Sequence, residues 1–246
     1  MKIVAISDIH GYLPELPECD VVTISGDIIP LHIQRNYEES IAWLSGPFQT
    51  WALNLPCKKV IFIAGNHDFV FERLWKNIDL SSNWTMHRDA QQITNILFQQ
   101  DEYDNKIVYL QDSTYKYEGK TFYGTPWCPN LSSWAFYGNS SWLTTMFKEI
   151  PYNTDVLLTH CPPKFGKQGE VLQKNNWNLG KDFGCEELQA AIETIFAFKE
   201  DNTWVVSGHI HSGNHNVEHN WMVKYVNVSL KDEDYEPTYK YFEFEI

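Results

Sequence analysis

The hydrophobic positions of the chain fall into short continuous runs, separated by longer stretches of mixed character. The clearest runs have the length of a β-strand and are rich in branched side chains, and they cover residues 2–7, 21–25, 59–64, 155–159 and 203–207. Continuous apolar character over such a length indicates strands that are buried on both faces of a sheet.

Between these runs, apolar residues recur every three or four positions, as they do on one face of a helix. One such segment covers residues 37–55, and the Gly-Pro pair at 46–47 predicts a kink or a break because proline disturbs the helical hydrogen bonds. A second covers residues 188–196 behind acidic residues at 186–187, which suit a helix N-terminus. Strands that alternate with helices predict an α/β fold.

The remaining segments are less regular. Residues 107–124 predict two or three short strands with a turn at 118–120, and the stretch from about 221 to 246 predicts two more. Residues 69–105 and 126–154 show the least regular pattern, so we expect loops there, placed over a functional site. No repeat, low-complexity tract or linker interrupts the chain, so we expect a single domain over residues 1–246.

Residues of metal-ligand type directly follow each of the buried runs. They are Asp8 and His10, then Asp27, then Asn66 and His67, then His160, and finally His209 and His211. In open α/β sheets, sites form outside the carboxyl ends of the strands, so these side chains are expected to converge although they are far apart in sequence. Each motif alone is also common in ordinary turns. Their repetition at the same position after each strand is what predicts a site.

The spacing and chemistry of these residues favour a metal centre. Side chains two positions apart in an extended segment point the same way, so Asp8 with His10, and His209 with His211, each present two ligands to one region. Carboxylate, imidazole and amide ligands without thiolates suit divalent or trivalent ions such as Mn, Fe, Zn, Co or Ni.

The charge of the chain limits its partners. The formal net charge is −13, which would repel a long polyanion such as duplex nucleic acid, because nucleic-acid binding relies on basic surfaces. A small phosphorylated substrate remains compatible with this charge, and a nuclease is disfavoured.

The cysteines and the N-terminus bear on the compartment. The five cysteines contain no CxxC pair, so neither a disulfide framework nor a thiolate zinc site is indicated. The N-terminus becomes polar too soon for a signal peptide, and no run approaches the ~18 apolar residues of a membrane span. We therefore expect a cytoplasmic protein without a membrane partner, and the sequence leaves its oligomeric state open.

Aromatic residues are dense, with 10 Trp, 13 Tyr and 14 Phe. A cluster between residues 127 and 142 either packs upon itself or offers a wall on which a flat ligand stacks. Trp127 and Trp134 are the residues of this cluster that we consider as substrate-binding groups.

The order of the motifs, from Asp8 to His211, resembles the calcineurin-like metallophosphoesterase superfamily. Within it, residues 65–71, 124–127 and 160–163 look like the small metallophosphoesterase-domain proteins. The resemblance implies an α/β fold in which two mixed β-sheets pack as a sandwich and are flanked by helices.

The resemblance also implies a role for each residue. Two transition-metal ions would be held as follows: the first by Asp8, His10 and His211, the second by Asn66, His160 and His209, with Asp27 bridging both. Paired ions activate a hydroxide that attacks phosphorus in line. His67 is the residue expected to protonate or stabilise the leaving oxygen.

One difference from the protein phosphatases of this superfamily narrows the range of expected functions. Protein serine/threonine phosphatases of this superfamily continue the second motif as GDxVDRG, whereas residues 26–30 read Gly-Asp-Ile-Ile-Pro. The second Asp and the Arg of that motif are absent, so the acidic partner of the catalytic histidine and the arginine that clamps phosphate are unidentified. We therefore expect an enzyme that hydrolyses a small phosphomonoester or phosphodiester, with a nucleotide or cyclic nucleotide as the favoured class. The alternatives are a nuclease, a phosphoprotein phosphatase, or a non-catalytic metal-binding scaffold. The sequence does not choose the native metal, with manganese among the candidates.

Overall fold

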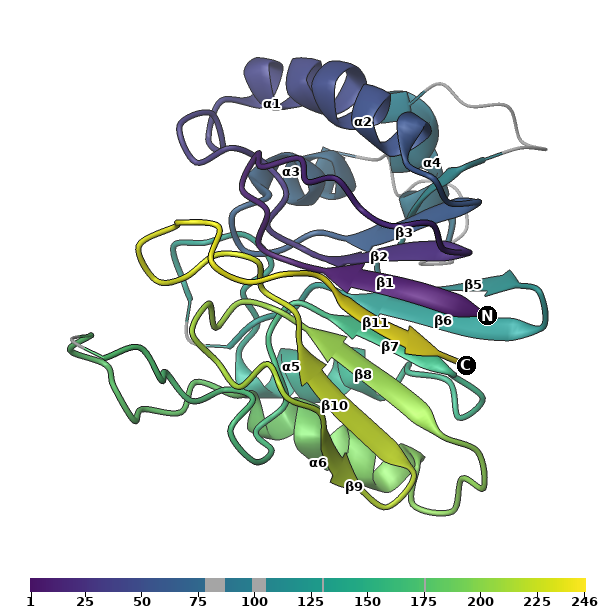
Figure 1. Ribbon diagram of the computed structural model, residues 1–246, viewed down its shortest axis with the longest axis vertical. Helices are drawn as coiled ribbons and strands as arrows, with labels where there is room; N and C mark the ends of the chain where they lie inside the picture. The colour runs from purple at the N-terminus through teal and green to yellow at the C-terminus, as the bar shows by residue number, and fades with distance from the viewer. Residues whose placement is uncertain (78–86, 99–104, 130, 175) are drawn as a thin grey trace.

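Two β-sheets pack face to face in the computed structural model, with helices outside them (Figure 1). The structure describes residues 1–77, 87–98, 105–129, 131–174 and 176–246. Both sheets are mixed, because each has a mostly parallel centre and an antiparallel strand at an edge. The predicted sandwich of two mixed sheets is confirmed.

The first sheet has five strands among the described residues. Their order is β11 (Phe242–Glu245), β1 (Lys2–Ile6), β2 (Val21–Ser25), β3 (Lys59–Ile63) and β4 (Ile107–Tyr109). Strands β1 to β4 are parallel, with Val21 of β2 in register with Ile3 on one side and Lys59 on the other. The carboxyl ends of β1, β2 and β3 therefore lie together at one edge.

The second sheet has six strands within the same part of the chain. Their order is β5 (Ser113–Tyr117), β6 (Lys120–Thr125), β7 (Val156–Thr159), β8 (Thr203–Ser207), β10 (Val223–Asn227) and β9 (Glu218–Asn220). Strands β6, β7, β8 and β10 are parallel, so their carboxyl ends also share an edge.

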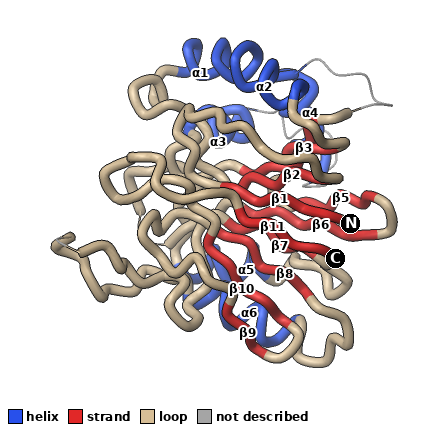
Figure 2. Tube along the Cα trace, in the orientation of Figure 1, coloured by secondary structure: helices blue, strands red, loops and turns tan. Residues whose placement is uncertain are grey.

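Successive side chains of a strand point to opposite faces of the sheet, and this builds two apolar layers. Ile3 and Ala5 of β1 pack into the layer between the sheets, while Val4 and Ile6 pack on the side of the helices. Figure 2 shows helices on both outer faces. Those near the first sheet are α1 (Tyr37–Trp43), η1 (Leu44–Phe48), α2 (Gln49–Asn54), α3 (Phe69–Asn77) and α4 (His87–Phe98), and those near the second are α5 (Ser140–Phe147) and α6 (Glu186–Ile195).

The strongest sequence patterns gave the right elements. The buried runs form β1, β2, β3, β7 and β8, and the segment at 188–196 lies in α6 apart from its last residue. In the 37–55 segment, a π-helical turn that contains Pro47 joins α1 to α2. The wider turn accommodates the proline, which cannot donate the usual backbone hydrogen bond, so the helix is distorted there but continues.

The two segments expected to be loops are partly helical, which corrects that prediction. Residues 69–105 contain α3 and α4, and residues 126–154 contain α5, while residues 78–86 and 99–104 lie outside the described part. Helix α3 buries Val70, Phe71 and Leu74 on one face, so its few apolar positions suffice to anchor it. The short strand β9 was not predicted either, because it lies at a sheet edge and buries little.

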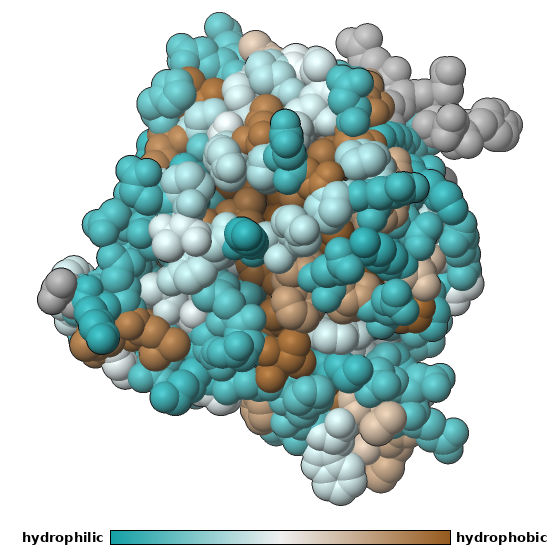
Figure 3. Space-filling view, in the orientation of Figure 1, coloured by the Kyte–Doolittle hydropathy of each residue, from teal (hydrophilic) through white to brown (hydrophobic). Residues whose placement is uncertain are grey.

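The visible surface is mostly polar, in contrast to the apolar core. In Figure 3, hydrophilic residues dominate the visible face, and many apolar groups lie in hollows between them. Among the described residues, no helix has both the length and the apolar character needed to cross a membrane.

Candidate metal centre

The polar residues after β1, β2, β3, β7 and β8 meet at the shared carboxyl edge of the two sheets. Asp8, His10, Asp27 and His209 adopt left-handed backbone conformations, with φ of 53°, 41°, 54° and 69°. Non-glycine residues pay of order 1–3 kcal/mol for such conformations, and they concentrate at functional sites. Backbones also approach closely here, because a Cβ at Gly208 would collide with the Ser7 hydroxyl and the Asp8 carboxylate.

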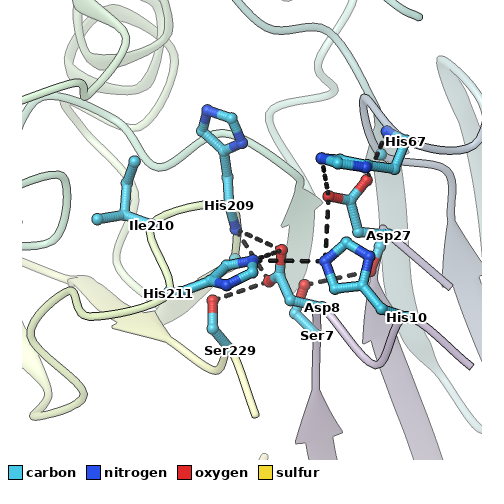
Figure 4. A network of polar contacts seen from close by, with 12 residues as sticks. Ser7, Asp8, His10, Asp27, His67, His209, Ile210, His211 and Ser229 are labelled. Atoms are coloured by element: carbon cyan, nitrogen blue, oxygen red, sulfur yellow. Dashed lines mark hydrogen bonds and ion pairs between the residues drawn. The ribbon is translucent and has the colours of Figure 1, made fainter. Parts of the chain in front are cut away.

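The Asp8 carboxylate organises one half of the centre (Figure 4). It accepts hydrogen bonds from the His209 backbone N–H at 2.9 Å and from the Ser229 hydroxyl at 2.8 Å. His211 Nε2 lies 3.4 Å from Asp8 Oδ1 and also 3.4 Å from His10 Nε2. Asp8, His10 and His211 thus converge as the sequence predicts.

The Asp27 carboxylate lies between several imidazoles. One oxygen accepts the His67 backbone N–H at 2.8 Å. The other is 3.4 Å from Nε2 of His160, 3.7 Å from Nε2 of His10 and 3.9 Å from Nε2 of His67. Asp27 therefore touches residues assigned to both halves of the predicted centre.

The other half contains Asn66, His160 and His209. Asn66 Oδ1 lies 2.9 Å from His160 Nε2, and the His160 and His209 rings are 5.0 Å apart. His160 Nδ1 donates to the Ser25 carbonyl at 2.8 Å, so that Nε2 faces the centre. A backbone carbonyl that fixes the far nitrogen of an imidazole is the usual support of a metal-binding histidine. His211 Nδ1 donates likewise to the Asp232 carbonyl at 2.8 Å.

Groups of donor atoms that could hold a metal ion follow from this packing. Within the described residues, four sets have ligand atoms all within 4.8 Å of one another, namely Asp8–His10–His211, His10–Asp27–His67, Asp8–Asp27–His160 and Cys128–His160–His209. The last set adds Cys128, which the sequence did not suggest because it belongs to no paired-cysteine motif.

Buried charge in the centre fits cations. Burial alone would lower the pKa of His160, but the adjacent Asp27 carboxylate raises it to about 10. In the same way, burial alone would lower the pKa of His211, but the adjacent Asp8 carboxylate raises it to about 9. The two protonated imidazoles balance two buried carboxylates, which is a role that bound cations take over when they displace those protons.

One further donor supports the fit. His10 turns its Nε2 toward Asp27 and His211, and burial lowers the pKa of His10 to about 3. A neutral imidazole is the form that binds metal. The donor set of carboxylates, neutral imidazoles and an amide therefore fits transition-metal ions.

His67 lies beside this centre and has a partner that the sequence did not reveal. Its Nδ1 is 2.5 Å from Gln34 Oε1, so the group that orients the imidazole is an amide oxygen. Its ring packs 4.3 Å from that of Trp134, and burial lowers its pKa. Gln34 lies 33 positions away in a loop, where no pattern distinguishes it.

Asp68 completes the loop that carries His67. Its buried carboxylate accepts the backbone N–H groups of Gly65 at 2.8 Å, Ile29 at 3.0 Å and Ile28 at 3.1 Å. These bonds tie the turn after β3 to the turn after β2, so Asp68 holds Asp27 and His67 in place, and it belongs to none of the four donor sets among the described residues.

Trp127 does not fit the predicted contact with a substrate. It is 3% exposed, and its ring packs against Trp75, Phe136 and Trp142. Its indole N–H donates to Asp112, a buried carboxyl whose pKa burial raises to about 7. The side chain satisfies a buried acceptor, and this corrects its assignment as a substrate-binding residue.

Replacing Trp127 by phenylalanine should therefore lower the free energy of unfolding. The smaller phenyl ring would keep most of the packing, but Asp112 would lose a donor, and an under-satisfied buried group costs about 1–3 kcal/mol. Urea unfolding measures this loss. The same change at Trp221, which is 91% exposed, should have almost no effect. An equal loss at both positions would contradict this role for Trp127.

Trp134 and Tyr235 are half-buried and lie beside imidazoles of the centre. Trp134 packs against His67, and the Arg35 guanidinium lies 5.2 Å from its ring and donates to the Ser133 carbonyl. The Tyr235 ring is 5.0 Å from those of both His10 and His211. Arg35 and Tyr235 are isolated in sequence, and only the fold brings them to the centre.

Comparisons with known proteins agree with this geometry. A family model described as calcineurin-like phosphoesterase matches residues 1–213. Human metallophosphoesterase domain-containing protein 1 is 26% identical over 245 residues, which cover 96% of this chain and 68% of the human protein.

Two further similarities are more limited. A protein of Emericella nidulans named probable rhamnogalacturonate lyase C is 28% identical over 220 residues, covering 87% of this chain but only 17% of that protein. The solved structure of phosphopantetheinyl hydrolase from Mycobacterium tuberculosis superposes with a TM-score of 0.50 at 14% identity, covering 95% of this chain and 90% of that one. At such identity the likeness shows the fold alone.

Proposed function

The chain belongs to the calcineurin-like phosphoesterase family, and we propose that it is a binuclear metal-dependent hydrolase of small phosphate esters. The observation that carries the proposal is the position of Asp27, a buried carboxylate in contact with imidazoles of both halves of the centre. A carboxylate in this position suits a bridge between two cations.

The proposed ligand sets follow the two halves. Asp8, His10 and His211 would hold one ion, and Asn66, His160 and His209 the other, with Asp27 shared. When bound, such ions polarise phosphoryl oxygens and make water nucleophilic near neutral pH. The backbone carbonyls of Ser25 and Asp232 bond to Nδ1 of His160 and of His211, so both imidazoles are held with Nε2 toward the centre where the phosphate would bind.

His67 is proposed as the proton donor to the leaving oxygen. With Nδ1 bonded to Gln34, its Nε2 faces Asp27 at 3.9 Å and is the nitrogen available to a substrate. The lowered pKa makes its protonated form a stronger acid, although a smaller fraction carries the proton at neutral pH. Because Gln34 is neutral, it orients the ring without adding a negative charge that would hold the proton.

The surroundings favour a flat, anionic substrate such as a nucleotide. Trp134 offers an aromatic face beside His67, and Arg35 places a positive charge near that face. Tyr235, which lies beyond the residues matched by the family model, adds a second ring over His10 and His211. Aromatic side chains bind nucleobases by stacking, and arginine binds phosphate or stacks in turn.

Replacing Trp134 by alanine should weaken nucleotide binding by about 1–3 kcal/mol, the usual worth of one base stacked on an aromatic ring. Hydrolysis of a small aryl phosphate should suffer less, because it has no base to stack. The measurement is the ratio of the two losses in kcat/KM. The matched control is Trp221→Ala, a 91% exposed tryptophan before β10, at the other end of the strands. Equal losses for both substrates in the folded Trp134 variant would remove the nucleotide preference.

A substrate panel tests the function itself. An aryl phosphate, a bis-aryl phosphate and nucleotides would each be offered with Mn, Fe, Zn, Co or Ni. Turnover of small esters is the expected result. Preference for duplex nucleic acid or for a phosphorylated protein would favour a nuclease or a protein phosphatase. Bound metal with no turnover of any ester would favour a non-catalytic scaffold.

A further inference from the structure

A pair of cysteines lies at the opposite end of the strands from the metal centre. Cys19 precedes β2 and Cys57 precedes β3, so both are at the amino ends of strands whose carboxyl ends carry Asp27 and His67. Both thiols are free, and nothing in the proposed hydrolysis uses them.

The backbone holds the two cysteines side by side. Val21 and Lys59 are register partners in the parallel pair β2–β3. Cys19 lies two residues before Val21, and Cys57 lies two residues before Lys59. The Cys19 N–H donates to the Pro56 carbonyl at 3.2 Å, and the Lys58 N–H donates to the Asp20 carbonyl at 3.0 Å. Segments paired in this way lie ~4.8 Å apart, within the range of Cα separations that disulfides span.

The two thiols differ in reactivity. A hydrogen bond between them raises the pKa of Cys19 and lowers that of Cys57, and the nearby Lys106 ammonium lowers the pKa of Cys57 further. Lys106 is itself fixed by the carbonyls of Leu53 and Leu55, at 2.8 Å and 2.7 Å. Cys57 is thus the better nucleophile, since the thiolate is the reactive form, and Cys19 is a neighbouring thiol that can react with it afterwards.

Small molecules can reach this pair. Cys19 is 8% exposed and Cys57 is partly exposed, and both line one surface cavity whose wall also carries Lys2 and Lys58. A second pair, Cys128 and Cys161, serves as a buried comparison. These two cysteines also hydrogen-bond to each other, but both are 0% exposed.

We propose that Cys19 and Cys57 form a redox-active dithiol, a site of reversible oxidation by hydroperoxides that is separate from the phosphoesterase centre. The Cys57 thiolate attacks one oxygen of hydrogen peroxide, the O–O bond breaks, and the released hydroxide takes up a proton to give water. The Cys19 sulfur then displaces the hydroxyl of the Cys57 sulfenic acid, which leaves as a second water. Two thiols lose two protons and two electrons in total, and peroxide is reduced to two waters.

The full-length protein tests this inference directly. After treatment with stoichiometric hydrogen peroxide and alkylation of the remaining thiols, peptide mass analysis should find residues 19 and 57 linked, with a loss of two thiols per chain. A thiol reductant should restore both. Cys19→Ser should stop the reaction at a sulfenic acid on Cys57 that a cyclic 1,3-diketone traps, and Cys57→Ser should abolish the rapid reaction.

Controls separate this inference from the proposed hydrolysis. Cys185→Ser should oxidise like the parent, because Cys185 is 0% exposed and stands outside the pair. Turnover of an aryl phosphate by Cys57→Ser should match the parent, because the pair lies at the other end of the strands. A disulfide between Cys128 and Cys161, a sulfenic acid trapped on Cys19 instead of Cys57, or a folded parent that keeps all its thiols would overturn the proposal.

Discussion

The Asp27→Asn variant should lose metal from both halves of the centre and lose most of its activity. The amide oxygen would still accept the His67 backbone N–H, which now bonds to Asp27 at 2.8 Å, so the turn should keep its shape. The negative charge shared among the imidazoles of His10 and His160 would be gone. Bound metal supplies several kcal/mol of transition-state stabilisation, so kcat/KM should fall by about 10³-fold or more.

Elemental analysis and turnover of an aryl phosphate, measured on the same preparation, check this result. Asp201→Asn is the matched control because the same change occurs at an exposed carboxylate. Circular dichroism should show that both variants are folded. Full metal content in the Asp27 variant would show that this carboxylate does not bridge the ions.

His67→Ala should behave differently, since the proposal places this imidazole beside the ligands. The variant should retain its metal but lose on the order of 10²–10⁴ in kcat, the usual worth of a positioned acid. The loss should be largest for alkyl esters, whose leaving oxygen needs a proton, and smallest for nitrophenyl esters. A series of esters with leaving groups of graded pKa measures this trend.

The outcome distinguishes a proton donor from a metal ligand. His67 Nε2 is 3.9 Å from Asp27 Oδ2 and belongs to one of the groups that could hold an ion, so the second role has a geometric basis. A loss of metal in His67→Ala, or an equal loss for every leaving group, would exclude the acid role. His219→Ala, at an exposed position on β9, provides the control.

The convergence of the centre was predictable because it depends on local rules. Buried parallel strands have a strong sequence signal, and their carboxyl ends share an edge, so the sequence alone predicts that Asp8, Asp27 and His160 lie together. The spacing of two residues also placed His10 and His211 at the centre, although the segments are not extended there, because Asp8, His10 and His209 have left-handed backbone conformations. The left-handed backbone at four of these residues was not foreseen, because nothing local distinguishes a strained turn from an ordinary one.

What the sequence missed depends on tertiary packing. Gln34, Arg35 and Tyr235 lie in loops without a distinguishing sequence pattern, and they meet His67, Trp134 and His211 only in the folded chain. Trp127 and Trp134 look alike in sequence, yet Trp127 is committed to the buried Asp112 whereas Trp134 packs on His67. Helices α3, α4 and α5 were missed because an amphipathic helix of two or three turns differs little from an irregular segment of similar composition.

A manganese titration of the metal-free protein tests most directly whether Asp27 bridges a pair of ions. Bound Mn²⁺ would be counted by elemental analysis, and its electron paramagnetic resonance spectrum and aryl phosphate turnover would be recorded at each step. We predict two ions per chain, a spin-coupled spectrum as the second ion binds, and activity that rises with that second ion. Full activity with one ion bound, or two ions that show no coupling, would contradict the account.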